Sequence, residues 1–418
     1  MNIINPIIKS SVFKNGLWLY LLQFANTVLP LLTIPYITRI LGAVGYGQFS
    51  VAYNWITYFQ VLVEYGYTLN GARKIAISKD SSEENRLWRS IVCSRAVLFF
   101  FSLIILNLFY IINRDPVRHK NMMILMLIVL SVVFQMNWLF QGKQEMKFIT
   151  IVNLTGRISS MILIFLFVKK SDHVSLYCFL YAFTFLVSSF LGLFVAVHRF
   201  NIHPSFASIS EIVNELRDGW VLFTSNAIAR VFGSVGITIL GIFANIEIVG
   251  AYSAIYKIPY ILNMCFSPIS QALFPYLSQC YSESYEKAIS LVKKLMLSVV
   301  GLFGIICVLI VILRRTLISL LFGVEFTKYS NIILLLCPQS LLGIINNFLG
   351  IQTLVAMGYK EYYSKCILYS TLILVLLNFL LCPYFQLYGT ALSSLITEAT
   401  LSIMLLFILK KRVLKKSE

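Results

Sequence analysis

Long apolar segments recur from one end of this chain to the other and limit the folds open to it. Hydropathy predicts twelve segments of about 20 residues, the length that crosses a hydrocarbon layer about 30 Å thick. They lie at 17–39, 44–67, 91–112, 121–141, 150–168, 175–197, 219–243, 249–271, 295–313, 330–350, 364–383 and 387–409. Of the 418 residues, 59% are hydrophobic and 12% are charged, against about a quarter charged in soluble proteins. The sequence therefore predicts an all-α polytopic membrane protein with twelve transmembrane helices.

The 34 Lys and Arg residues outnumber the 17 Asp and Glu residues and are spread unevenly between the predicted loops. Most of them fall on the side of the N-terminus, which also holds the longer hydrophilic loops expected near 68–90, 198–218 and 276–293. Since cytoplasmic loops carry an excess of Lys and Arg, we expect both termini to be cytoplasmic. Topology then explains the net charge of +17, which gives no reason to expect a nucleic-acid partner.

The chain carries traces of an internal repeat. NGLW at 15–18 opens the first predicted span, and DGWV at 218–221 opens the seventh. Parallel repeats of six spans, with a site between the halves, are a common transporter architecture. We therefore expect an N-terminal lobe at 1–200, a cytoplasmic linker at 201–218 and a C-terminal lobe at 219–418.

The cysteines and histidines form no pattern typical of a metal site or a disulfide. The eight Cys residues are single and lie mostly inside apolar runs, and the four His residues fall in predicted loops. A cysteine in such a run ordinarily packs as a small hydrophobic residue. We expect no metal and no cofactor.

Residues 15–79 carry a pattern that matches a known family of membrane proteins. Its positions are Asn26, Leu29-Pro30, Pro35-Tyr36, Arg39, Leu41-Gly42, Gly45 to Phe49, Gly66, Arg73, Ile75 and Ala76. This region resembles the opening of the Wzx-type polysaccharide flippases, which belong to the superfamily of multidrug, oligosaccharidyl-lipid and polysaccharide (MOP) exporters. Twelve spans and 418 residues suit that family along the whole chain.

The resemblance implies a MATE-like arrangement of two six-helix lobes around a central cavity. It also implies the task of moving an undecaprenyl-diphosphate-linked oligosaccharide, such as an O-antigen repeat unit for lipopolysaccharide, across the bacterial inner membrane. The expected partners are that lipid-linked glycan, membrane lipids, a proton or sodium ion for coupling, and other polysaccharide assembly proteins.

Five ionisable residues fall inside predicted spans or close to their ends. They are Glu64, Arg157, Arg230, Lys257 and Glu398. A charge at the membrane centre costs about 2.5–3.5 kcal/mol on insertion scales and usually faces a bundle interior or a wet cavity. The cations outnumber the acids, so we expect Arg157, Arg230 and Lys257 to bind the diphosphate through charge-assisted hydrogen bonds. The alternative is that the arginines pair with Glu64 or Glu398, or bond to Ser, Asn and carbonyl oxygens, and only hold helices together.

Arg39 and Arg73, both within the family pattern, are further candidates for substrate binding. Arg39 ends the first span near the outer face, where an arginine that reaches toward the interface is ordinary. Arg73 follows the second span, where it either captures the diphosphate at the inner leaflet or serves as a topogenic charge.

Glu64 and Glu398 are candidates for ion coupling. A carboxylate held inside the membrane can take up a proton from one side and release it on the other. The alternative is a structural role, in which each acid pairs with a cation or bonds to polar neighbours such as Ser394 and Thr397.

Two other functions compete with a flippase. A MATE-like exporter of cationic drugs would be expected to line its cavity with acids, whereas this interior is basic. A polytopic polysaccharide polymerase would be expected to show a large outer loop or an acidic D-x-D motif, and the sequence has neither. We therefore expect a non-enzymatic transporter that alternates between inward-open and outward-open states.

Overall fold

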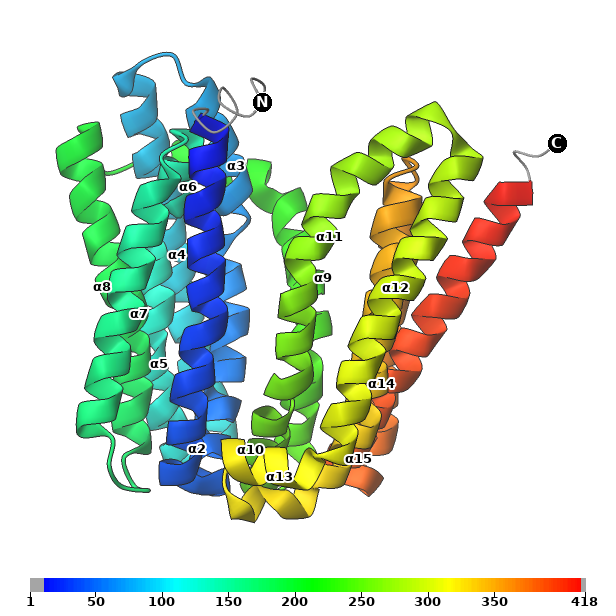
Figure 1. Cartoon of the computed structure of the whole chain (residues 1–418). Helices are drawn as coiled ribbons and strands as arrows, with labels where there is room; N and C mark the ends of the chain where they lie inside the picture. The colour runs from blue at the N-terminus through cyan, green and yellow to red at the C-terminus, as the bar shows by residue number, and fades with distance from the viewer. Residues whose placement is uncertain (1–10, 415–418) are drawn as a thin grey trace. The chain divides into compact units, whose positions relative to one another are not determined.

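The computed structural model describes residues 11–414, whose regular structure is entirely helical (Figure 1). Long helices suit this sequence because a segment inside a bilayer must satisfy its backbone hydrogen bonds internally. The chain divides into two compact units, Met1–Val231 and Phe232–Glu418. The division falls within helix α9 (Ile209–Phe243). The lobe and linker boundaries expected from the sequence stay a prediction.

The first unit is built from long helices that run side by side (Figure 1). Its helices before α9 are α2 (Ser11–Glu64), α3 (Tyr67–Ile77), α4 (Ser81–Asn113), α5 (Pro116–Val133), α6 (Asn137–Gly142), α7 (Met146–Phe167) and α8 (Val174–Phe200). Helix α8 packs against both α5 and α7, and α2 packs against the same two helices. Segments far apart in the sequence therefore hold this unit together.

The second unit follows the C-terminal part of α9. Its elements are α10 (Ile246–Ile255), α11 (Lys257–Glu283), α12 (Tyr285–Ile312), α13 (Arg314–Leu321), the 3₁₀ helix η1 (Val324–Ile332), α14 (Ile333–Leu349), the π-helix η2 (Gly350–Val355) and α15 (Lys360–Leu414). Helix α14 packs mainly against α15 and α12. The π-helix continues α14 directly, and such segments are frequent at functional sites.

Nine helices within residues 11–414 are long and apolar enough to cross a membrane. Two of them cover two predicted spans each, joined at Gly42 (φ 67°) and at Gln386 (φ 48°). Counting each of these as two gives eleven spans. The remaining predicted span, 249–271, corresponds to α10 and part of α11, which are not among the nine. The all-α membrane architecture is confirmed, and the count of twelve is not.

The hydrophilic stretches predicted as loops, 68–90, 198–218 and 276–293, are all mostly helical. In the first, Asp80 caps α4, and its side chain accepts a hydrogen bond from the backbone of Glu83 at 2.8 Å. A capped helix of this kind begins well before its apolar part. The loop prediction was wrong here because hydropathy marks where a helix leaves the membrane, not where the helix ends.

The first unit has two helix breaks, one at the end of the predicted span 44–67 and one within the predicted span 121–141. Between α2 and α3, Tyr65 (φ 50°) and Gly66 (φ 78°) adopt the left-handed region of backbone space, which glycine tolerates without steric cost. Between α5 and α6, residues 134–136 leave the α-helix. The short helices α3 and α6 that follow these breaks pack against each other.

Candidate functional site

Arg157 and Arg230 belong to the first unit and lie on membrane-spanning helices. Arg157, on α7, is partly buried and interacts electrostatically with Tyr181 of α8. Arg230, on α9, is exposed. The ion pairs seen in the described part of this unit use other basic residues, namely Lys74, Arg86, Arg89, Arg118, Lys143, Lys147 and His173. Within the described residues of the first unit, neither Arg157 nor Arg230 forms an ion pair with a carboxylate.

Arg39 and Arg73 are both exposed on the first unit, on α2 and α3. The ion pairs of α3 are made by the neighbouring Lys74, whose Nζ lies 2.8 Å from Glu215 and 3.2 Å from Asp218. Lys74 thus holds the start of α9 against α3. Arg73 takes no part in that contact and remains at the surface.

Lys257 is the first residue of α11 and is the one predicted substrate-binding residue that belongs to the second unit. It is partly buried, and its ammonium nitrogen lies 5.5 Å from the centre of the Tyr260 ring. A cation at this distance from an aromatic face is attracted by the ring quadrupole.

Glu398 lies on α15 in a network of polar side chains within the second unit. The Asn346 amide on α14 donates to the Glu398 carboxylate at 2.7 Å and to its backbone carbonyl at 2.9 Å. The Ser402 hydroxyl donates to the side-chain amide oxygen of Asn346 at 2.6 Å. Just beyond, in the π-helix, the buried Gln352 donates to the Ser270 carbonyl at 2.8 Å. The described hydrogen-bond donor of this carboxylate is therefore an amide rather than a cation.

Glu64 is the last residue of α2 and is partly buried beside the helix break. Its carboxylate accepts a hydrogen bond from the Thr68 hydroxyl at 2.8 Å. It also lies within electrostatic range of Arg95 on α4. Of the ionisable residues singled out in the sequence, Glu64 is thus one that the structure places within electrostatic range of a buried cation.

Arg95 was missed by the sequence analysis, although it falls inside the predicted span 91–112. It is 0% exposed, and its Nη1 donates to the backbone carbonyls of Val132 and Gln135, each at 3.0 Å. Its guanidinium carbon lies 5.4 Å from the centre of the Tyr67 ring. Arg95 therefore contacts both helix breaks, since Gln135 lies in the α5–α6 break, Val132 just precedes it, and Tyr67 follows the α2–α3 break. The missed signal was simply a charge within an apolar run.

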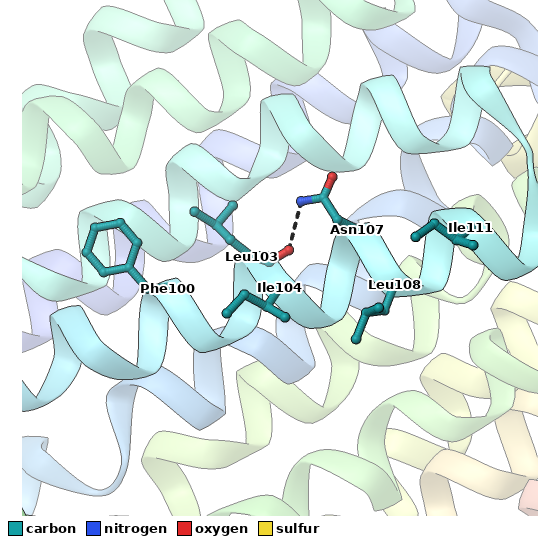
Figure 2. Close-up of a pocket in the computed structure, with 6 residues that line it drawn as sticks. All are labelled: Phe100, Leu103, Ile104, Asn107, Leu108 and Ile111. Atoms are coloured by element: carbon teal, nitrogen blue, oxygen red, sulfur yellow. Dashed lines mark hydrogen bonds between the residues drawn. The ribbon is translucent and has the colours of Figure 1, made fainter.

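A shallow recess of about 350 Å³ lies along one side of α4 (Figure 2). Its lining residues are Phe100, Leu103, Ile104, Asn107, Leu108 and Ile111. The one polar group among them, the Asn107 amide, donates to the Leu103 carbonyl at 2.9 Å. The recess is apolar, and none of the predicted site residues lines it.

Comparison with known proteins identifies relatives along almost the whole chain. A protein of Escherichia coli (strain K12) named "Putative O-antigen transporter" is 28% identical over 413 residues, covering 97% of this chain and 99% of the relative. The solved structure of the lipid II flippase MurJ in an inward closed conformation superposes with a TM-score of 0.74 at 13% identity, covering 95% of this chain and 87% of MurJ. An inward-facing MATE family multidrug transporter of the MOP superfamily gives a TM-score of 0.71 at 12% identity, covering 94% of this chain and 99% of the transporter.

The TM-scores of these two structures confirm the MATE-like fold expected from the sequence. The family is shown by a separate match. The model of the family described as "Polysaccharide biosynthesis protein" matches residues 12–281, well over half of the chain. This protein therefore belongs to the polysaccharide biosynthesis protein family.

Proposed function

We propose that this protein is a flippase that moves an undecaprenyl-diphosphate-linked oligosaccharide, such as an O-antigen repeat unit, across the bacterial inner membrane. Membership of the polysaccharide biosynthesis family supports a glycan as cargo. The name of the Escherichia coli relative supports an O-antigen substrate. The fold shared with a lipid II flippase supports a lipid-linked form of that glycan and movement by alternating access.

The observation that carries the proposal is the setting of Arg157 and Arg230. Both lie on membrane-spanning helices, and within the described residues of their unit neither has a carboxylate partner. An arginine in a membrane segment requires water, a carbonyl or an anion to offset its lost hydration. The planar guanidinium matches two oxygens of a phosphate at once. A diphosphate is thus a fitting ligand for these side chains.

Three further cations complete the proposed substrate path. Lys257, which can act as a point charge, contributes from the second unit, while Arg39 and Arg73 act at its two ends. Arg73 is exposed and outside the Lys74 ion pairs, which supports a role in first capturing the diphosphate. Such capture requires Arg73 to face the cytoplasmic leaflet, as the distribution of Lys and Arg predicts.

Ion coupling is assigned to Glu398 and Glu64. Glu398 has an amide donor rather than a cationic partner, so protonation would not break an ion pair of the described network. Asn346 and Ser402 would transmit a change at Glu398 between α14 and α15. A proton is the first candidate for the coupling ion and sodium the second.

We further propose that the protein is not an enzyme and that it acts with other proteins of polysaccharide assembly. It would lie in the inner membrane with both termini in the cytoplasm. Its work consists of binding, reorientation and release of the lipid-linked glycan, and none of these steps breaks a covalent bond. The positive-inside distribution supports the orientation.

The test uses cells in which delivery of surface glycan depends on this protein. We expect Arg230→Ala to abolish the surface glycan and Arg230→Lys to retain part of it, because the charge survives but the two-pronged contact does not. Arg315→Ala, a change at an exposed arginine of α13, is the matched control and should leave delivery unchanged. Immunoblots of membranes establish equal insertion. Normal surface glycan in the Arg230→Ala strain would remove that residue from the site.

A further inference from the structure

The first part of α9, before the membrane-spanning segment, is strongly amphipathic. We call residues 208–220 the linker helix. It begins at a capping box, in which the Glu211 backbone donates to the Ser208 hydroxyl at 3.3 Å and the Ser208 backbone donates to the Glu211 carboxylate at 2.9 Å. This reciprocal pair fixes the start of a helix in a stretch that hydropathy alone assigns to a loop.

One face of the linker helix carries three acids that bind basic residues of α3 and α4. Glu211, Glu215 and Asp218 are spaced four and three residues apart, so they project from one side. Glu211 lies 2.8 Å from Arg89 and 3.2 Å from Arg86. Glu215 and Asp218 share Lys74, as described above. The acids of this face are therefore all engaged in ion pairs within the first unit.

The opposite face is apolar and open. Ile209, Val213, Leu216 and Trp220 follow one another at four, three and four residues, which places them in a single stripe. Ile209 is 81% exposed, while Val213 and Trp220 are each 56% exposed. Phe206, just before the helix, is 95% exposed. An apolar stripe of this size exposed to water would promote aggregation, so we expect a partner to cover it.

We propose that this apolar stripe lies in the headgroup and acyl-chain boundary of an anionic lipid surface, so that the linker helix is an interfacial membrane helix. The position along the chain supports this, since Trp220 stands where the linker helix runs into the membrane-spanning part of α9. Tryptophan is enriched at that depth. An apolar stripe beside a polar face, on a helix of low net hydrophobicity, is the pattern of helices that lie in this boundary.

The charges around the stripe favour an anionic lipid as its partner. Arg217, on the flank of the linker helix, is exposed. Such a residue near an anionic membrane surface adds about 1 kcal/mol of attraction in general. The three acids point to the other side and are held by cations, so they would not repel the headgroups.

The glycine at position 219 lets the linker helix pack closely against Tyr65, because a Cβ atom there would lie 2.8 Å from the Tyr65 ring.

The test measures the depth of a tryptophan probe on each face of the linker helix. The full chain carrying Trp220→Phe is reconstituted in vesicles that contain phosphatidylglycerol with brominated acyl chains, which quench nearby indole fluorescence. This parent protein keeps four other tryptophans, and its signal is subtracted from that of each probe variant. Val213→Trp or Asn214→Trp is then added. These two positions are adjacent in sequence, but only Val213 lies in the apolar stripe, so each serves as the control for the other.

We expect strong quenching by the brominated lipid at position 213 and a loss of most of that quenching at position 214. Equal quenching at both positions would overturn the proposal. So would a probe at 213 that iodide in the water quenches instead, or one that neither quencher reaches because the second unit or another protein covers it. Should Val213→Trp fail to give a monodisperse protein, the pair Ile209→Trp and Ser210→Trp replaces it. The result does not depend on which substrate the protein carries.

Discussion

Replacement of the buried Arg95 by methionine should destabilise the first unit severely. Methionine keeps much of the side-chain length and its apolar part but cannot donate a hydrogen bond. The change removes both 3.0 Å bonds to the carbonyls of Val132 and Gln135, along with the contact to Tyr67. It also leaves Glu64 without the nearby buried cation.

The expected cost follows from these contacts. Hydrogen bonds to a charged group contribute about 1.5–3 kcal/mol each. Loss of the two bonds from Arg95 should therefore lower the free energy of unfolding by about 3–6 kcal/mol. Arg95→Lys should lose less, because the ammonium retains the charge beside Glu64 but lacks the guanidinium fork.

Reversible unfolding in mixed micelles, followed by tryptophan fluorescence, measures this loss. Arg118→Met is the matched control, since Arg118 pairs with Asp115 near the surface of the same unit, and exposed pairs contribute about 0–1 kcal/mol. Adding Glu64→Gln to Arg95→Met should recover part of the loss, because no uncompensated carboxylate then remains. A loss at Arg95 no larger than the loss at Arg118 would refute the reasoning.

Three further predictions concern other parts of the chain. Gly66→Ala should lower stability by at least the 1–2 kcal/mol or so of a left-handed L-residue, because its φ is 78° and its Cβ would meet Leu222 at 2.7 Å; Gly233→Ala, with open space around it, is the control in the same unfolding assay. Glu398→Gln should leave downhill transport in vesicles but remove its acceleration by an imposed pH gradient, and an acceleration equal to wild type would exclude Glu398 as the coupling group. The hydrogen bond from Lys328 lowers the pKa of Glu247, so this pair should add a small stability above the unfolded pKa of about 4.3 that disappears as the pH falls through the lower folded pKa. Glu247→Gln should abolish that pH dependence in thermal unfolding scans between pH 3 and pH 7.

The membrane architecture could be predicted from the sequence because apolar length and charge distribution are local properties. The fold class and the family followed from residues 15–79 and from the recurrence of apolar segments, and the comparisons confirm both. The two helix breaks were harder to predict from the sequence. The α2–α3 break has a glycine at Gly66, whereas the α5–α6 break at 134–136 contains neither glycine nor proline and gives no local signal.

The pairing of charged side chains could not be predicted, since it depends on which helices meet in three dimensions. Lys74 and Glu215 are 141 positions apart in the sequence. The linker helix was assigned to a loop because its composition is polar on average, although acids at Glu211, Glu215 and Asp218 opposite an apolar stripe were readable at helical spacing. Arg95 lay within the same criterion that selected Arg157 and Arg230, so its omission reflects an incomplete application of that criterion.

Translocation in purified vesicles tests the central claim most directly. Proteoliposomes that contain this protein as the only protein receive a defined undecaprenyl-diphosphate-linked oligosaccharide in the inner leaflet. A glycan-cleaving enzyme outside the vesicles then reports the appearance of the substrate in the outer leaflet. The account predicts rapid exposure with wild-type protein and exposure no faster than in protein-free vesicles with the double variant Arg157→Ala, Arg230→Ala. Wild-type vesicles that match protein-free vesicles, or a double variant that matches wild type, would contradict it.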